Sequence, residues 1–225
     1  ARLADCRPVP RVDIQALKHY RLERIRAELV RSDIPMCLLS NPLSLRYATD
    51  TRRFSMFQSR VPVMYTAIVV DGPVVVYGGL ARDDATVGDD DIECRQGRAL
   101  SVFNGGLDFS GEVALLMRDM NSLLRERGIM ERRIAIENLS PLVAAALIND
   151  GFEVFDAQVL IERARLIKSA EEIECMRWSI AACELGISNV ASALVSGVRE
   201  TELLAVLNYA NIVNGGEWAD SRQLV

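Results

Sequence analysis

The segment of this sequence best suited to bind a ligand is an arginine-rich and aromatic run between residues 46 and 60. It contains four arginines, three aromatic residues and one methionine. Guanidinium groups donate paired hydrogen bonds to carboxylates, and aromatic rings offer a face to the rest of a ligand. The run therefore predicts a site for an anionic or carboxylate-bearing ligand, with these candidate substrate-binding residues: Tyr47, Arg52, Arg53, Phe54 and Phe57. The alternative is an ordinary surface loop whose aromatic side chains cover the edge of a core.

Other chemistry finds little support in the sequence. His19 is the single histidine and has no partner at metal-ligand spacing, so we interpret it as a surface residue. The acidic run Asp89–Asp91 lacks the ligand number and glycine-bent loop of a calcium site and is typical of a solvated turn. The sequence has no GxSxG elbow, and its glycine pairs match neither nucleotide-binding spacing. We predict no catalytic residue and no metal ligand, and hence no cofactor, within this chain.

Composition excludes several classes of partner. The 225 residues include 31 acidic and 26 basic side chains, and a net charge of −5 argues against a nucleic-acid surface. No apolar run approaches the ~20 residues that span a bilayer, and the N-terminus shows no secretory pattern. The five cysteines are scattered, without a CxxC pair, which suits a reducing compartment. We expect a cytoplasmic protein that binds neither nucleic acid nor membrane.

The first elements of the chain place the candidate segment in a linker between strands. Apolar residues at helical spacing predict an amphipathic helix over 13–31, and a short apolar run predicts a buried strand over 36–39. Asn41-Pro42 after this strand indicates a turn. Two β-branched runs around Gly72-Pro73 predict a β-hairpin over 65–77.

Helices and strands alternate in the next part of the chain. Ser110 precedes a helical pattern that continues to Leu124 and stops at Gly128. Ser140-Pro141 is a typical helix start, and short strands are expected over 134–136 and 152–155. This alternation predicts an α/β layer fold with a partly parallel sheet.

The pattern becomes purely helical near the C-terminal end. The sequence from Ser169 to Glu172 is a capping box, and it predicts a long amphipathic helix that stops at Gly197. A second helix is expected from about Glu200 to Val213. These helices have apolar stripes but no following sheet to cover, so we divide the chain into domains at 1–163 and 164–225 and regard the second as incomplete.

Two of these runs carry a family resemblance. The sequence from Arg165 to Arg177, followed by Gly197-Val-Arg-Glu-Thr-Glu-Leu203, resembles the join between the two domains of the creatinase/aminopeptidase P/prolidase family. The resemblance implies an α/β fold for residues 1–163, as a creatinase-type N-terminal domain in which a mixed sheet is flanked by helices. It also implies that residues 164–225 begin a truncated α+β pita-bread domain.

A narrower likeness points to one branch of this family. The runs Asn41–Asp50 and Asn211–Trp218 resemble the branch that includes dimethylsulfoniopropionate lyases. That branch has methionine, glutamine and tryptophan just after the Tyr-Ala-Thr-Asp run. This chain departs from it there, because it has Arg53, Phe54, Met56 and Phe57.

The resemblance implies a function first as part of a hydrolase. It suggests the N-terminal portion of a dimetal Xaa-Pro peptidase or creatinase-type enzyme that forms a homodimer and lends substrate contacts to its partner's active site. A complete member would use a divalent metal pair, with ligands beyond residue 225, on a dipeptide or another small molecule. The alternatives are a C–S lyase acting on dimethylsulfoniopropionate-like substrates and a non-catalytic dimerisation or peptide-binding module.

Overall fold

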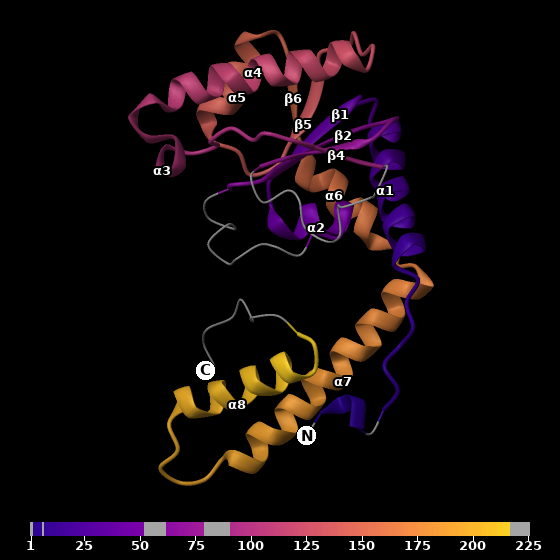
Figure 1. Ribbon diagram of the computed structural model, residues 1–225, viewed down its shortest axis with the longest axis vertical. Coiled ribbons are helices and arrows are strands. Elements are labelled where there is room, and N and C mark those ends of the chain that lie inside the picture. The colour runs from indigo at the N-terminus through magenta and orange to yellow at the C-terminus, as the bar shows by residue number, and fades with distance from the viewer. Residues whose placement is uncertain (1, 6, 52–61, 79–90, 217–225) are drawn as a thin grey trace. The chain divides into compact units, whose positions relative to one another are not determined.

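The computed structural model describes residues 2–5, 7–51, 62–78 and 91–216, which form two compact units (Figure 1). One unit spans residues 18–167 and contains the sheet. The other combines residues 1–17 with residues 168–225 and is helical where it is described. We call them the sheet unit and the helix-pair unit.

The sheet unit is built on a mixed sheet whose described strands lie in the order β4-β3-β2-β1-β5-β6. β1, β5 and β6 run parallel to one another, β2 is antiparallel to both β1 and β3, and β3 is parallel to β4. The strands are β1 (Met36–Leu39), β2 (Tyr65–Val69), β3 (Val74–Tyr77), β4 (Ile92–Arg95), β5 (Arg133–Ile136) and β6 (Glu153–Asp156).

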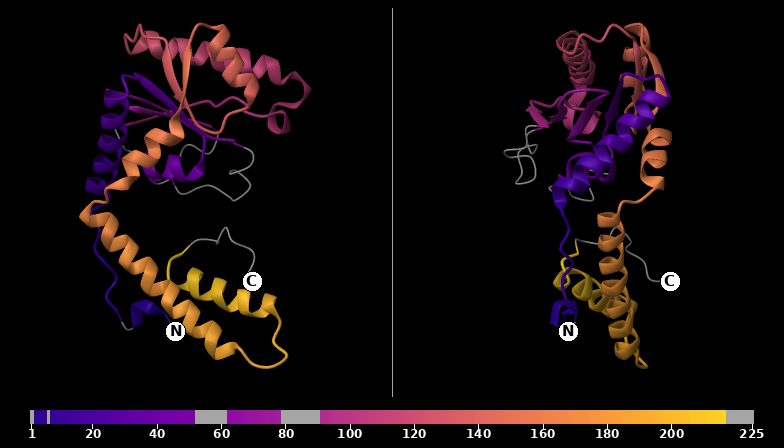
Figure 2. Two further views of the ribbon diagram at one scale, coloured as in Figure 1. Left: turned by 180° about the vertical axis from the view of Figure 1, so that it is seen from behind. Right: turned by 90° about the vertical axis from the view of Figure 1, so that its right-hand side faces the viewer.

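Helices cover both faces of this sheet, as Figure 2 shows from two sides. Successive strand residues point to opposite faces, so that Cys37 and Leu39 of β1 contribute to one core and Met36 and Leu38 to the other. The first core is closed by α1 (Ile14–Arg31), α2 (Pro42–Thr49) and α6 (Ala157–Leu166). The second is closed mainly by α4 (Phe109–Glu126) and α5 (Pro141–Asn149), with the short α3 (Val102–Gly105) and η3 (Gly106–Asp108) preceding α4.

This architecture confirms the predicted α/β fold with a mixed, partly parallel sheet flanked by helices. The hairpin is present as β2 and β3, and Ser140 caps α5 by accepting a hydrogen bond from the Leu142 amide. Helix α4 begins at Phe109, so Ser110 lies inside it and is not its cap.

The expected turn at Asn41-Pro42 is wrong, because a helix begins there. The Asn41 side chain accepts a hydrogen bond from the Leu43 amide at 3.0 Å, and Pro42 occupies the first turn of α2. Residues 46 and 47 are therefore helical, within the connection between β1 and β2. The sequence analysis also missed β4 and α6. Asp156 is the N-cap of α6, and its carboxylate accepts from the Gln158 amide at 2.8 Å.

In its described part, the helix-pair unit contains η1 (Leu3–Asp5), α7 (Ala170–Ala193), α8 (Glu200–Val213) and the first residues of α1. The predicted capping box is confirmed: Glu172 accepts from the Ser169 amide at 3.0 Å, and the Glu172 amide donates to the Ser169 hydroxyl at 3.2 Å. The two helices approach closely at Gly186, where a Cβ would lie 2.9 Å from Leu207 Cδ1. Neither helix, nor any other described one, is long and apolar enough to cross a bilayer.

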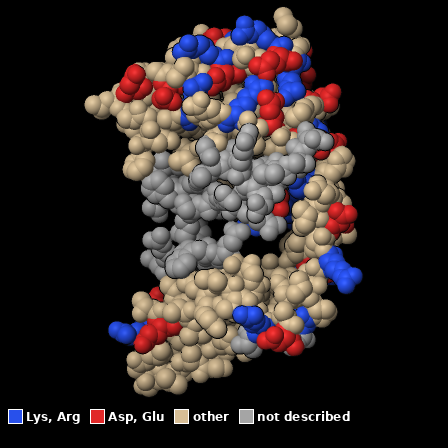
Figure 3. Space-filling view, viewed as in Figure 1, with Lys and Arg blue, Asp and Glu red and all other residues tan. Residues whose placement is uncertain are grey.

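Much of the apolar surface of this helix pair is exposed. In the view of Figure 3, most of the surface over α7 and α8 carries no charged side chain. Four apolar residues at seven-residue spacing along α7 and at its C-cap are 41–64% exposed: Ile173, Ile180, Ile187 and Leu194. On α8, Tyr209 and Ile212 are 66% and 49% exposed. The helices thus have an apolar face that the described residues leave open. The division at 1–163 and 164–225 stays a prediction; the compact units comprise residues 18–167 and residues 1–17 with 168–225.

Candidate functional site

Tyr47, the first of the predicted substrate-binding residues, lies in the interior of the sheet unit. Its side chain is buried in α2, and its hydroxyl donates to the Ala164 carbonyl at 3.2 Å. The Arg21 guanidinium lies over the ring, 5.1 Å from its centre. Within this chain, Tyr47 therefore joins α2 to α6 and α1, and its predicted contact with a substrate stays a prediction.

The other predicted residues, Arg52, Arg53, Phe54 and Phe57, lie outside the described part of the chain. The structure does describe how the chain reaches them. The Thr49 hydroxyl donates to the Leu45 carbonyl at 2.8 Å and lies 2.8 Å from the Thr51 hydroxyl. Asp50 ends the helix in the left-handed conformation, and its amide donates to the Arg46 carbonyl. Thr49, Asp50 and Thr51 are all buried, so the point from which the segment departs is fixed.

A buried carboxylate lies at the other end of α2. Glu137 follows β5 directly and is 5% exposed. Its Oε2 accepts a hydrogen bond from the Asn41 amide at 3.1 Å, and its Oε1 accepts from the Ser44 hydroxyl at 2.7 Å. The Ser40 hydroxyl donates to the Glu137 carbonyl at 2.6 Å. These residues gather where the parallel strands β1 and β5 end, which is the edge at which open α/β sheets place their sites.

The environment of Glu137 has opposing effects on its charge. Burial raises the pKa of this carboxyl above its ordinary value. The hydrogen bonds from Ser44 and from the Asn41 and Ser40 backbone, and the positive charge of Arg165, lower the pKa in turn. Sequence reasoning missed Glu137, although a single acidic residue directly after a buried parallel strand was the available signal.

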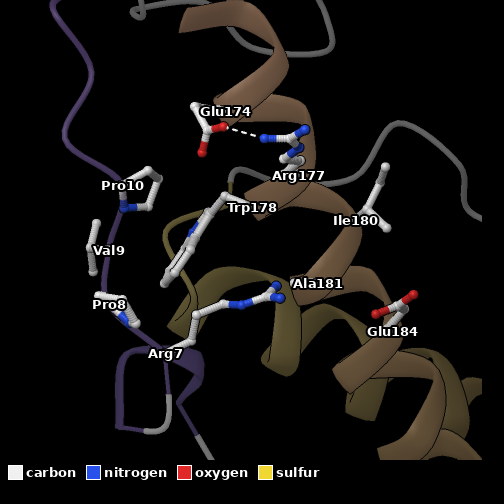
Figure 4. Close-up of a pocket in the computed structure, with 10 residues that line it drawn as sticks. All are labelled: Arg7, Pro8, Val9, Pro10, Glu174, Arg177, Trp178, Ile180, Ala181 and Glu184. Atoms are coloured by element: carbon white, nitrogen blue, oxygen red, sulfur yellow. Dashed lines mark hydrogen bonds and ion pairs between the residues drawn. The ribbon is translucent and has the colours of Figure 1, made fainter. Parts of the chain in front are cut away.

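A groove lies beside α7 in the helix-pair unit (Figure 4). It has a volume of about 560 Å³ and lies between the segment of residues 7–10 and one side of α7. The Trp178 indole forms part of its wall and donates to the Asn214 carbonyl at 3.3 Å. Its charged lining is balanced, because two arginines oppose two glutamates, and Arg177 pairs with Glu174 at 2.6 Å. The groove consequently selects no particular ligand charge.

The described residues contain no group of three or more histidine, cysteine or acidic side chains that could hold a metal ion. His19 is exposed on α1, as expected for a surface residue. Asp89 and Asp90 lie outside the described residues. The side chains among the described residues therefore do not fit the ligand set of a metal pair.

Known proteins resemble this chain in sequence. No family model matches it. Over 222 residues, or 94% of this chain, it is 28% identical to the dimethylsulfoniopropionate lyase DddP of Roseobacter denitrificans. It is also 28% identical to DddP of Roseovarius nubinhibens over 218 residues. Each alignment covers 49% of the relative, so the chain spans about half the length of the curated relatives it matches.

The fold also has solved counterparts. The Xaa-Pro dipeptidase of Bacillus anthracis superposes with a TM-score of 0.60 at 19% identity, over 86% of this chain and 48% of that one. At this identity the likeness concerns the fold alone. Together with the sequence relatives, it confirms the resemblance to the creatinase/aminopeptidase P/prolidase family: this chain has the fold of about half of a pita-bread enzyme of the prolidase type.

Proposed function

We propose that this chain is the sheet-bearing part, with the first helices of the catalytic part, of an enzyme of the creatinase/aminopeptidase P/prolidase family. The observation that carries the proposal is the alignment that spans 94% of this chain but 49% of the curated lyase. The open apolar face of α7 and α8 supports it, since such a face needs a further layer of structure to cover it. The catalytic residues, and the metal ligands of the family, then lie outside residues 1–225.

The reaction we favour is cleavage of a C–S bond in a sulfonium carboxylate. The sequence analysis placed the hydrolase first and the lyase second. We reverse this preference, because 28% identity over nearly the whole chain is a stronger likeness than 19% identity in a shared fold. In such an elimination a base removes the proton next to the carboxylate, and the electron pair forms a carbon–carbon double bond. The C–S bond breaks, and a neutral sulfide leaves with its electrons. Hydrolysis of an Xaa-Pro dipeptide is the second candidate, favoured by the fold of the solved dipeptidase.

Both candidate substrates carry a carboxylate, and this defines the part proposed for the present chain. The arginines that follow Thr51 would hold that carboxylate, and Phe54 and Phe57 would shape the pocket around the rest of the ligand. We further propose that two copies associate, so that this segment serves the active site of the partner. The segment follows the C-terminal end of α2, which the hydrogen bonds of Thr49 hold in place. A fixed starting point supports a role in which the segment extends in a set direction, toward the partner's active site.

The proposal is tested in the full-length enzyme that contains this chain. Its kcat/KM is measured for dimethylsulfoniopropionate, by release of dimethyl sulfide, and for an Xaa-Pro dipeptide. Arg53→Ala should lower kcat/KM by about tenfold to a hundredfold on the substrate that the parent uses, since a charged hydrogen bond contributes about 1.5–3 kcal/mol. The matched control is Arg118→Ala, an exposed arginine on α4, which should leave kcat/KM unchanged. Activity on neither substrate contradicts the assignment, and equal values for Arg53→Ala and the parent remove the segment from the site.

A further inference from the structure

The groove in the helix-pair unit has the size and the lining of a site for a small molecule. Its volume of about 560 Å³ lies within the range of about 300–1,000 Å³ that ligand pockets usually have. All of its lining residues belong to one compact unit, because they come from residues 7–10 and from α7. The first wall contains two prolines, and the facing wall contains the Trp178 indole and Ala181 (Figure 4). The two walls thus offer apolar surface to the body of a ligand.

Both walls are held in place by Asn214, the C-cap of α8. Its backbone carbonyl accepts the hydrogen bond from the Trp178 indole and so orients the ring. Its side chain accepts from the Leu3 amide and donates to the Ala210 carbonyl at 2.6 Å. Leu3 is buried in the small core of this unit, and the prolines that follow it restrict the backbone of their wall. The groove is therefore preorganised, which lowers the free-energy cost of binding a ligand.

Two of the four charged side chains that line the groove have no partner among the described residues. Glu174 and Arg177 pair with each other at 2.6 Å. The side chains of Arg7 and Glu184 form no ion pair with any described residue, and both are exposed. Arg7 extends from the first wall, and Glu184 lies on α7 (Figure 4). The groove thus offers one guanidinium to an anionic group, one carboxylate to a cationic group, and an indole with two prolines to the atoms between them.

We propose that this groove binds a small zwitterion, whose carboxylate is held by Arg7 and whose cationic group is held by Glu184. Guanidinium groups bind carboxylates through paired hydrogen bonds, and an indole beside the carboxylate of Glu184 adds to the attraction for a cation. A zwitterion has no net charge, as the balanced lining requires. An onium carboxylate and a free dipeptide share this chemistry. The proposal goes beyond the function proposed above and does not rest on it.

The binding test follows the indole N–H signal of Trp178 by NMR in the 225-residue chain. The chain has two tryptophans, and Trp178→Phe assigns the signal by its loss. Dimethylsulfoniopropionate and the dipeptide alanylproline are the probes, and they distinguish the two sources of the zwitterion. At least one should shift the signal saturably, with a Kd at or below about 10 mM. The comparison ligand is 4-methylpentanoate, which has CH in place of the sulfonium. It should bind about fivefold more weakly than dimethylsulfoniopropionate, because it offers Glu184 no charge.

Two substitutions test the assigned roles. Arg7→Ala and Glu184→Gln should each raise the Kd about fivefold, since each removes one of the two charges that face the ligand. The matched control is Arg11→Ala, because Arg11 is an exposed arginine near the same segment that does not line the groove, and its Kd should equal that of the parent. An unchanged Kd in Arg7→Ala or Glu184→Gln would overturn the proposal.

The unsubstituted chain decides the matter even if a variant loses its fold. No saturable shift with either probe, or equal affinity for 4-methylpentanoate and dimethylsulfoniopropionate, would also overturn the proposal. Arg7 and Glu184 would then be two solvated charges beside an apolar groove.

Discussion

The two units of this chain differ in how completely they bury their own apolar side chains. The sheet unit has a core on each face of its sheet, and side chains such as Leu38, Leu116 and Ile134 have no exposed surface. The core of the helix-pair unit consists of Leu3, Ala181 and Ala182 as buried members. Several of its large apolar residues, such as Ile180, Ile187 and Tyr209, remain 55–66% exposed. The sheet unit therefore has the features of a complete layered fold, and the helix pair has those of one layer.

The difference shows that a segment of this sequence can have strong local helix signals and still bury few apolar side chains. Helices α7 and α8 have good local signals, including the Ser169 capping box and the close approach at Gly186. Local signals contribute little free energy by themselves, because most helical stability in proteins comes from packing of an apolar face. The helix pair thus has good local signals but leaves an apolar face uncovered among the described residues.

The largest expected effect is the contrast between two leucines. Leu116→Ala removes a fully buried side chain from the core under α4 and should lower the free energy of unfolding by about 2–5 kcal/mol. Leu194→Ala removes a side chain that is 64% exposed at the end of α7 and should change it by no more than about 0.5 kcal/mol. Urea unfolding of the 225-residue chain measures both. Similar losses at the two sites would contradict the comparison.

An intermediate effect is expected on self-association. The exposed apolar face of α7 should drive the chain to form dimers or larger assemblies. Ile187→Glu should weaken this association at least about tenfold, which is about 1.4 kcal/mol. Ile148→Glu on α5 is the matched control, since both isoleucines are 59% exposed, and it should have no effect. Light scattering at micromolar concentration would refute the prediction if the parent chain were a uniform monomer.

The smallest effect concerns the pH dependence of stability at Glu137. Burial raises the pKa of this carboxyl in the folded chain above the ordinary value of 4.5, and the hydrogen bond from Ser44, with smaller effects of the Asn41 and Ser40 backbone and Arg165, only partly opposes this. Between 4.5 and the raised value the folded state binds more protons than the unfolded state, so stability is lost as the pH rises through this window. Glu137→Gln has no carboxyl to titrate there. The free energy of unfolding of Glu137→Gln minus that of the parent should therefore increase from pH 4 to pH 8 in urea titrations. A decrease of this difference would mean that folding lowers the pKa of Glu137.

The sequence predicted the fold well where local chemistry and tertiary structure agree. The hairpin around Gly72-Pro73, the Ser140 cap and the Ser169 capping box were all recognised, because each is specified by neighbouring residues. Asn41-Pro42 carried the same kind of cap signal as Ser140-Pro141, but we interpreted it as a turn, and α2 was missed.

The candidate site was harder to predict because it depends on contacts between distant residues. The hydrogen bond from the Asn41 amide to the Glu137 carboxylate joins residues 96 positions apart, and the sequence around either residue does not predict it. Tyr47 was predicted as a ligand contact from its arginine-rich neighbourhood, and only the fold shows its hydroxyl bound to Ala164. Short-range patterns contain no information about which strand end meets which helix start.

Residue-level native hydrogen exchange on the 225-residue chain tests the contrast between the two units most directly. The amides of β1 and β5 should exchange only through global unfolding, because each strand has a neighbour on both sides and lies between two cores. The amides of α8 should exchange at least about a hundredfold faster, through opening of the helix pair alone. Equal protection of α8 and β1 would contradict the account, because it would mean that the helix pair is as firmly folded as the sheet.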